Sequence, residues 1–386
     1  MSPVIKKINL SWKNCALPTC YGKIRAPGNF SLSQKSSHRL QDPEKGDHNM
    51  LPIGYLPCTQ DPPSGANMAR VLDEIVAEAQ AVEASGWDGC FITEHHQQED
   101  GYLPNPLLVA GLVGMKTQRI KVGTCVLLLP LHHPVHVAED CAVIDLATKG
   151  RLVLSVGVGY QPHDFDAFEV PVAERATRTE EAMEVMRKAW TGKRFAYEGK
   201  HFRYQDTLIT PTPYQQPGPP IWMASWTPPG LRRAAKMADG WIADPVQSLP
   251  VIKDYTNRYR AACQKVGRKP YICLMRDAVV ADSLKEAEAQ SGPTMYTHRF
   301  YFQYGAYVPD EHLKDVKRPE DLSFKQCAKE RLIVGSPEDC LQQLQMWKEA
   351  IQPDYVIIRF RQPGGPSHQQ TLEAIRRFGE KVIPKL

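Results

Sequence analysis

The sequence lacks the features that mark several large classes of protein. No apolar segment approaches the ~20 residues needed to span a bilayer, and the N-terminus lacks the apolar central region of a secretory signal. The ten cysteines are scattered singly, without a Cys-x-x-Cys pair. This pattern argues against a disulfide framework and favours reduced, buried thiols. We therefore expect a cytoplasmic protein that neither spans a membrane nor depends on disulfides.

An excess of charge is also missing from most of the chain. Residues 1–49 carry eight Lys or Arg and three acidic residues, whereas residues 50–386 carry 39 Lys or Arg and 40 acidic residues. A body so close to neutral gives no electrostatic reason to bind nucleic acid or an anionic membrane. Residues 1–49 are polar and show no sustained periodicity. We expect a disordered extension, or upstream sequence preceding a start at Met50, with an organelle-targeting peptide as the alternative.

From Leu51 onward, apolar runs alternate with segments of helical periodicity. The expected strands are residues 52–57, 88–93, 120–129, 151–158, 220–224, 240–243, 271–281 and 354–360. The expected helices are residues 66–85, 107–116, 134–148, 172–190, 230–238, 249–266, 337–350 and 369–382, with more helix from Leu284. The strands are apolar on both faces, as in covered parallel sheets. This favours an α/β fold, a (β/α)8 TIM barrel over residues 50–386, rather than an open doubly wound sheet with a helical second domain.

Two segments exceed the usual length of a connecting loop. Residues 195–219 are polar and rich in proline. Residues 292–331 carry an aromatic cluster made of Tyr296, Phe300, Tyr301, Phe302, Tyr304 and Tyr307. So many aromatic side chains either form a satellite core or cover a binding mouth. Both interpretations stay open, and we expect insertions at the C-terminal mouth of the barrel.

The sequence Glu94-His95-His96 ends the second expected strand, which is where such barrels place their active sites. Side chains alternate along a strand, so we expect the two histidines to point to different sides, with one facing the cavity. An imidazole can exchange a proton near neutral pH, which makes His95 the catalytic candidate. His132, His133 and His136 raise the question of zinc. No His-Glu-x-x-His and no cysteine pair completes such a site, and we expect no metal.

Two more strand ends carry candidate cofactor residues. Gly157-Val158-Gly159-Tyr160 lacks the third glycine of a dinucleotide fingerprint, and Pro162 follows in place of a helix. We expect its glycines to leave room for a flat ligand. Ser225-Trp226-Thr227 precedes a helix, where hydroxyls and free N–H groups suit a phosphate; an ordinary N-cap is the alternative. The motifs GxxxxGKS/T and GxSxG are absent, which disfavours nucleoside triphosphate chemistry and serine hydrolysis.

The order and spacing of several segments resemble the bacterial luciferase-like flavin-dependent monooxygenases. These segments are Thr93-Glu94-His95-His96, Asn105-Pro106, residues 122–130, His133-Pro134-Val135, Ala138-Glu139-Asp140, Lys149-Gly150-Arg151, residues 221–225 and Ala238-Asp239-Gly240-Trp241. The resemblance implies a (β/α)8 barrel with insertions and reduced FMN at its mouth, commonly supplied by a separate flavin reductase. His95 then matches the family's active-site histidine.

The same resemblance implies the cofactor contacts. Cys125-Val126 matches a dipeptide that backs the flavin ring and can contain a cis bond. Gly157 stands where luciferase has a reactive cysteine, so no thiol role transfers. Val158 stands where luciferase has a phosphate-binding arginine, which shifts the expected phosphate contacts toward residues 160 and 225–227. The expected cofactor-binding set is Glu94, Thr124, Cys125, Val126, Gly157, Gly159, Tyr160, Ser225, Trp226 and Thr227.

The reaction implied by the resemblance is oxidation of a small organic substrate by O2, through a peroxide formed on reduced flavin in a water-poor cavity. The alternative is a deazaflavin-dependent oxidoreductase that transfers hydride on the same barrel. In those relatives the second strand tends to end in Asp-His-Phe, where this chain has Glu94-His95-His96. A non-catalytic flavin-binding relative is a third possibility, against which His95 argues. A homodimer through exterior helices such as residues 107–116 is a further hypothesis.

Overall fold

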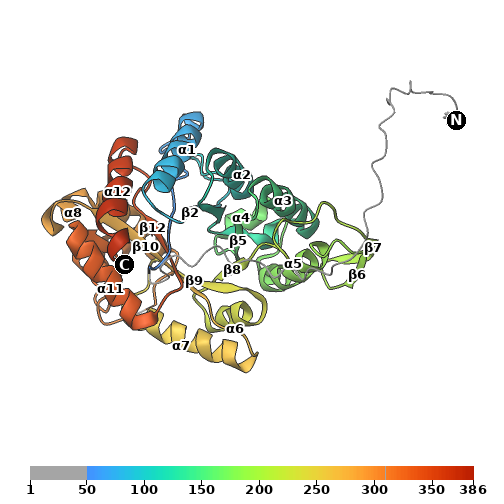
Figure 1. Cartoon of the computed structure of the whole chain (residues 1–386). Coiled ribbons are helices and arrows are strands. Elements are labelled where there is room, and N and C mark those ends of the chain that lie inside the picture. The colour runs from blue at the N-terminus through green and yellow to red at the C-terminus, as the bar shows by residue number, and fades with distance from the viewer. Residues whose placement is uncertain (1–49, 309) are drawn as a thin grey trace, which may run out of the picture. The chain divides into compact units, whose positions relative to one another are not determined.

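The computed structural model describes residues 50–308 and 310–386, in which eight parallel strands close into a barrel (Figure 1). The barrel strands are β1 (Ile53–Tyr55), β2 (Gly89–Ile92), β3 (Lys121–Thr124), β5 (Leu152–Gly157), β8 (Ile221–Ala224), β9 (Gly240–Ala243), β10 (Ile272–Val280) and β12 (Tyr355–Arg359). Each strand pairs in parallel with the next, and β12 pairs with β1 to complete the ring. The expected (β/α)8 barrel is confirmed. The expectations for residues 1–49 lie outside the described residues.

Helices follow the strands and cover the outside of the barrel (Figure 1). The longer ones are α1 (Met68–Ala84), α2 (Pro106–Lys116), α3 (Pro134–Ala147), α5 (Arg175–Ala189), α6 (Pro228–Met237), α7 (Leu249–Lys265), α9 (Gly292–Gln303), α11 (Pro337–Ile351) and α12 (His368–Lys381). Several begin with proline at the first helical position, where no N–H is needed. For α2, the side chain of Asn105 also accepts a hydrogen bond from the Leu108 N–H at 3.1 Å.

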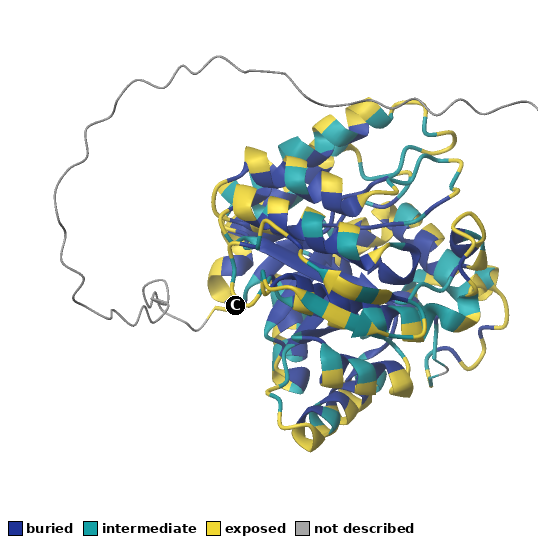
Figure 2. Cartoon of the chain, turned by 90° about the vertical axis from the view of Figure 1, so that its right-hand side faces the viewer, coloured by how far each residue is buried: buried dark blue, intermediate teal, exposed yellow. Residues whose placement is uncertain are grey.

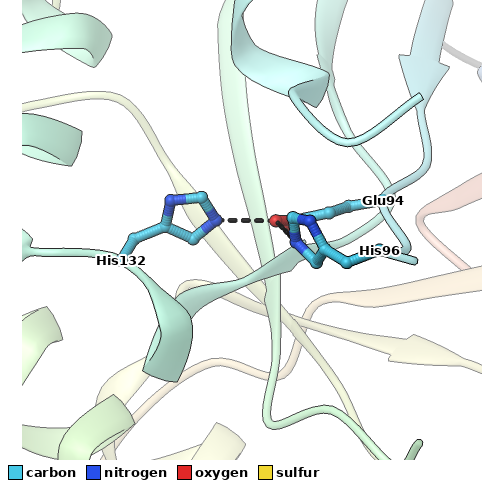
Figure 3. Close-up of side chains that lie close together, drawn as sticks. All are labelled: Glu94, His96 and His132. Atoms are coloured by element: carbon cyan, nitrogen blue, oxygen red, sulfur yellow. Dashed lines mark hydrogen bonds and ion pairs between the residues drawn. The ribbon is translucent and has the colours of Figure 1, made fainter. Parts of the chain in front are cut away.

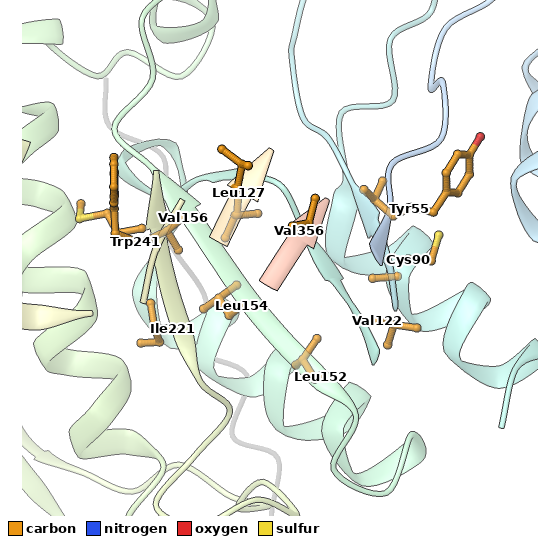
Figure 4. Packing of buried hydrophobic residues seen from close by; sticks show 14 of the residues in the cluster. Tyr55, Cys90, Val122, Leu127, Leu152, Leu154, Val156, Ile221, Trp241 and Val356 are labelled. Atoms are coloured by element: carbon orange, nitrogen blue, oxygen red, sulfur yellow. The ribbon is translucent and has the colours of Figure 1, made fainter. Parts of the chain in front are cut away.

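Alternation of side chains along the strands gives the barrel two apolar layers. One layer fills the interior, where Phe91, Trp222 and Tyr355 lie against one another with ring centroids 5.3–5.8 Å apart. The other lies between the sheet and the helices and includes Leu152 and Leu154 (Figure 4). Among the described residues, most exposed positions lie on the outer faces of the helices and in loops (Figure 2). The filled interior leaves the carboxyl ends of the strands as the place for a site.

Three local expectations need correction. Residues 195–219 contain a β-hairpin of β6 (Phe195–Glu198) and β7 (Arg203–Thr207), which the polar composition concealed. Pro162 opens a helix, α4 (Pro162–Asp166), rather than replacing one. A short extra strand, β11 (Ile333–Gly335), pairs with β10 outside the barrel ring, and β4 (Leu127–Leu128) pairs with β5.

The remaining short elements are α8 (Leu284–Gln290), α10 (Phe324–Ala328), η1 (Leu129–Leu131), η2 (Val172–Glu174), η3 (Pro319–Asp321) and η4 (Ile383–Lys385). The eight cysteines within the described ranges are free and buried, as expected. Within those same ranges, no helix is both long enough and apolar enough for a bilayer span.

Candidate active site

The two histidines after β2 point to different sides of the chain, as strand alternation predicts. The His95 side chain is 15% exposed and lines a cavity at the carboxyl ends of the strands. The His96 side chain instead packs against Phe168, with ring centroids 4.6 Å apart, and is buried. Two neighbouring residues of one type therefore have separate environments, and His95 faces the open space.

A buried carboxylate fixes the orientation of His95. Asp164, in the first turn of α4, lies with Oδ2 3.0 Å from His95 Nδ1 and accepts the backbone N–H of His96 on Oδ1 at 3.0 Å. The Asp164 side chain is fully buried. Because a carboxylate only accepts hydrogen bonds, His95 donates from Nδ1 and keeps its lone pair on Nε2. The arrangement prepares Nε2 to take up a proton.

Glu94 hydrogen-bonds two other histidines, His96 and His132 (Figure 3). Its Oε1 accepts from His96 Nε2 at 2.8 Å and from His132 Nε2 at 2.7 Å, and its Oε2 accepts the Leu128 N–H. Burial would raise the pKa of Glu94, but these hydrogen bonds hold the pKa below its ordinary value. The three side chains also offer one metal-ligating atom each within 4.8 Å. The short separations match hydrogen bonds, and the absence of a metal stays a prediction.

The cavity beside His95 has a volume of about 110 Å³ and mixes aromatic with polar side chains. Tyr102 and Tyr160 contact the His95 ring edge-on, with centroids 4.9 and 5.6 Å away. The complete lining is Gln60, His95, Gln98, Asp100, Tyr102, Tyr160, Gln161, Tyr296, Thr297, Phe300, Tyr301, Arg359, Gln362 and Pro363. Four of these residues come from α9. The aromatic segment 292–331 thus reaches the cavity while Met295 and Phe302 join a small core of their own.

The strand-end residues expected to touch a cofactor are held mainly by the protein itself. The Thr124 hydroxyl is buried and donates to the Ser155 carbonyl at 2.6 Å. The peptide bond between Cys125 and Val126 is cis. Burial raises the pKa of the Cys125 thiol to about 12, so this group stays a thiol at neutral pH. None of these three residues lines the cavity beside His95, and their contact with a cofactor stays a prediction.

The glycines after β5 allow close packing between parts of the chain. A Cβ on Gly157 would lie 2.7 Å from Val126 Cγ2. Gly159 has a φ of +74°, and a Cβ there would lie 2.7 Å from the Phe165 ring. The two glycines thus allow Val126 and Phe165 to approach the backbone closely, and their role beside a flat ligand stays a prediction. Tyr160, which follows them, is the member of this segment that lines the cavity.

The segment before α6 offers fewer donors than expected. Pro228 and Pro229 lack N–H groups, and the Gly230 N–H already donates to the Thr227 side chain at 3.3 Å. This geometry is that of an N-cap with proline in the first turn, which was the alternative expected for this segment. The hydroxyls of Ser225 and Thr227 remain the predicted phosphate contacts. Trp226 packs on Tyr160 at 5.6 Å and so belongs to the surroundings of the cavity.

The chemistry of the lining fits a flavin or deazaflavin ring. Such a ring has apolar faces and an edge of carbonyl and N–H groups. Tyr102, Tyr160 and Tyr301 provide flat apolar surface, and the amides of Gln98 and Gln161 provide donors and acceptors at the same cavity. The Gln161 amide also lies 3.1 Å from His95 Nδ1.

Sequence reasoning missed four residues that the fold brings to this place. Asp164 and Gln161 come from the α4 region, whereas Arg359 and Gln362 follow the last barrel strand. Arg359 carried a signal that could have been used, because it is a charge that ends an apolar strand, like Glu94. Asp164 carried only a weak one, an acidic residue in the first turn after a proline.

Together, the closed parallel barrel and a histidine–carboxylate pair at its mouth define a (β/α)8-barrel enzyme. A family model described as luciferase-like monooxygenase matches residues 52–351. The chain belongs to this luciferase-like monooxygenase family, whose members include flavin- and F420-dependent oxidoreductases.

The relatives of this chain include both flavin-dependent and F420-dependent enzymes. The oxygenase component of flavin-dependent trigonelline monooxygenase from Acinetobacter baylyi is 23% identical over 82% of this chain and 90% of its own. The F420-dependent glucose-6-phosphate dehydrogenase of Nakamurella multipartita is 27% identical over 81% of this chain and 92% of its own. The oxygenating constituent of 3,6-diketocamphane monooxygenase from Pseudomonas putida, solved with FMN, has a TM-score of 0.75 and 21% identity over 87% and 99%.

Proposed function

We propose that this chain is the oxygenase component of a two-component monooxygenase that uses reduced FMN and O2 to oxidise a small organic substrate. The observation that carries the proposal is His95. Its Nδ1 is tied to buried Asp164, while its Nε2, which lies 3.4 Å from the Gln161 amide nitrogen, is the nitrogen that we assign as the base beside an aromatic cavity. The Glu94-His95-His96 ending of β2, rather than Asp-His-Phe, favours the flavin branch over the deazaflavin branch.

The residues of this chain would bind, orient and shield. Reduced flavin supplies the oxygen-activating chemistry when bound. Tyr102, Tyr160 and Tyr301 exclude water from the reacting centre, and His95 Nε2 accepts or returns a proton there. Asp164 acts as a positioning residue, because it fixes the ring and the tautomer of His95.

A rapid-mixing experiment tests the choice of cofactor. The full chain is loaded either with reduced FMN or with reduced F420 and mixed with aerated buffer while absorbance is followed. An FMN absorbance transient that outlasts the reoxidation of free flavin supports the oxygenase. The oxygenase proposal would be wrong if the chain bound F420 tightly, showed no such transient and transferred hydride to an organic acceptor. These results would assign it the deazaflavin-dependent function instead. That alternative is represented by the 27% identical F420-dependent relative.

We expect His95→Ala to keep its fold and flavin affinity while product formation per flavin oxidised falls by ~10²-fold, the usual contribution of a proton-transfer group. His136→Ala is the matched control, since His136 is an exposed histidine on α3. Unchanged product yield in His95→Ala would remove His95 from the mechanism.

Two partners accompany this proposal. The name "oxygenase component" of the Acinetobacter relative supports a separate flavin reductase. A second copy of the chain is suggested by the apolar surface of α2 and α3, which pack side by side. The exposed apolar side chains there are Leu108, Leu112, Met115, Val143 and Leu146. Exposed apolar side chains gathered on two neighbouring helices are typical of a protein interface.

A further inference from the structure

A buried arginine at the end of β12 contributes to the cavity wall. The Arg359 side chain is 9% exposed and lines the cavity together with His95. Asp277, at the facing position of β10, accepts from its Nε at 2.6 Å and its Nη2 at 3.0 Å. The third nitrogen, Nη1, has only a long contact of 3.5 Å with the Tyr301 hydroxyl. This nitrogen therefore has donor capacity left for a ligand.

A second buried cation shares the carboxylate that balances Arg359. His298 Nε2 lies 2.9 Å from Asp277 Oδ2, and both side chains are fully buried. Burial opposes the charge of His298, but the bond to Asp277 raises its pKa to about 9. At neutral pH one carboxylate thus faces two cations, which leaves the cluster net positive. Elsewhere in the lining, Asp100 Oδ2 accepts from Gln60 at 2.6 Å, while its Oδ1 has no hydrogen-bond partner among the described residues; this second carboxylate faces the same cavity.

Two polar side chains that line the cavity with Arg359 have hydrogen-bond donors without partners in the described part of the chain. Gln362 is 1% exposed, and neither its Nε2 nor its Oε1 makes a hydrogen bond. Thr297, on α9, is 8% exposed and its hydroxyl is likewise unpartnered. Both residues line the same cavity. Buried polar atoms are nearly always satisfied in folded proteins, so these two point to a polar ligand.

We propose that Arg359, Gln362 and Thr297 form a subsite for the carboxylate of the organic substrate. The two carboxylate oxygens would accept from Arg359 Nη1, Gln362 Nε2 and the Thr297 hydroxyl, three donors that suit a charged, planar acceptor. The body of the substrate would then lie among the rings of Tyr296, Phe300 and Tyr301. This substrate class, a small monocarboxylic acid with an apolar body, rests on the proposed function, because the same cavity holds His95.

The test measures binding without turnover, so that it stands apart from the oxygenase test. Monocarboxylic acids from acetate to benzoate are titrated into the FMN-loaded full chain by calorimetry, each against its primary amide. We expect the acids to bind at least 10-fold more tightly than their amides. Gln362→Leu and Thr297→Val should each weaken acid binding by about 10- to 100-fold, the loss of one hydrogen bond to a charged group.

Folding stability and flavin affinity supply the controls. Both variants remove unpartnered polar atoms, so their melting temperatures should stay equal or rise. Gln362 closes a backbone turn with Gly365, which its side chain does not enter. Thr256→Val is the matched control, because the Thr256 hydroxyl is also buried and unpartnered but lies on α7, outside the cavity lining. It should leave acid binding unchanged.

Three results would overturn the subsite. One is equal affinity for acids and amides across the series, absence of binding included. Another is a large fall in melting temperature in Gln362→Leu, which would show that its amide has protein partners. A third is a loss of FMN affinity that parallels the loss of acid affinity, which would assign these residues to the cofactor. A preference for acids in a chain that proves to use F420 would sink the oxygenase proposal and leave the subsite standing.

Discussion

Replacing Glu94 by glutamine is the most direct test of the hydrogen-bonded group behind the active site. Three donors converge on this buried carboxylate: His96 Nε2, His132 Nε2 and the Leu128 N–H. In Glu94→Gln, the amide oxygen can serve the two histidines, but the amide nitrogen then faces the Leu128 N–H. The variant must lose at least one hydrogen bond and leave one buried donor unsatisfied.

The magnitude follows from those two losses. A hydrogen bond to a charged acceptor contributes about 1.5–3 kcal/mol, and an unsatisfied buried donor costs a further ~1–3 kcal/mol. Part of this is offset because the variant no longer buries a charge. We expect the free energy of unfolding to fall by about 3 kcal/mol, which lowers the melting temperature of a domain of this length by roughly 4 °C. Glu99→Gln, at an exposed glutamate, should change neither quantity.

The pH dependence gives a second, independent signature. The pKa of Glu94 is depressed in the folded protein, so its stabilisation is present above the ordinary value of 4.5 and is lost as pH falls through the folded-state pKa. The stability gap between wild type and Glu94→Gln should be full at pH 7 and should narrow below pH 4.5. Urea unfolding across this range measures it. A variant as stable as the wild type would refute the reasoning, and a chelator that lowered wild-type stability would indicate a metal among these residues instead.

Three further predictions concern other parts of the molecule. Gly157→Ala should lower the free energy of unfolding by about 1–3 kcal/mol, because its Cβ would meet Val126, whereas Gly292→Ala, with nothing within 4 Å, should be neutral in the same urea titration. Leu112→Glu should convert a dimer to monomers in sedimentation experiments, since it places a charge in the exposed apolar surface of α2. The raised pKa of His298, about 9, adds stability that is full below the ordinary value of 6.5 and is lost as pH rises through 9. Melting temperatures between pH 6 and 10 should therefore fall more for the wild type than for His298→Gln.

The barrel could be predicted from the sequence because each strand is buried on both faces. Leu152–Gly157, for example, is buried at all six positions and reads as one apolar run. The hairpin of β6 and β7 carries no such run, since Phe195–Glu198 alternates half-buried with exposed residues. A strand that contacts the body with only one side leaves a pattern too short and too polar to separate from a loop.

The active site could be predicted only as far as single strand ends allow. The position of His95 after β2 followed from the fold class and the strand boundary. Its partner Asp164 lies 69 positions further along the chain. No sequence pattern between the two residues predicts that their loops lie side by side. Arg359 shows the converse, because it ends the apolar strand β12, and the rule that selected Glu94 would also have selected it.

One carboxylate links the two histidines that the chain places side by side. Asp164 holds the His95 ring with one oxygen and the His96 backbone N–H with the other. The same contact that orients the candidate base therefore also fixes the turn of the chain that sends His96 to Glu94. The base beside the cavity and the buried group behind it are thus parts of one hydrogen-bonded unit. A change at Asp164 should disturb the contacts of both histidines, whereas a change at His95 should remove only the contact with Oδ2 and leave the His96 N–H bond to Oδ1 in place.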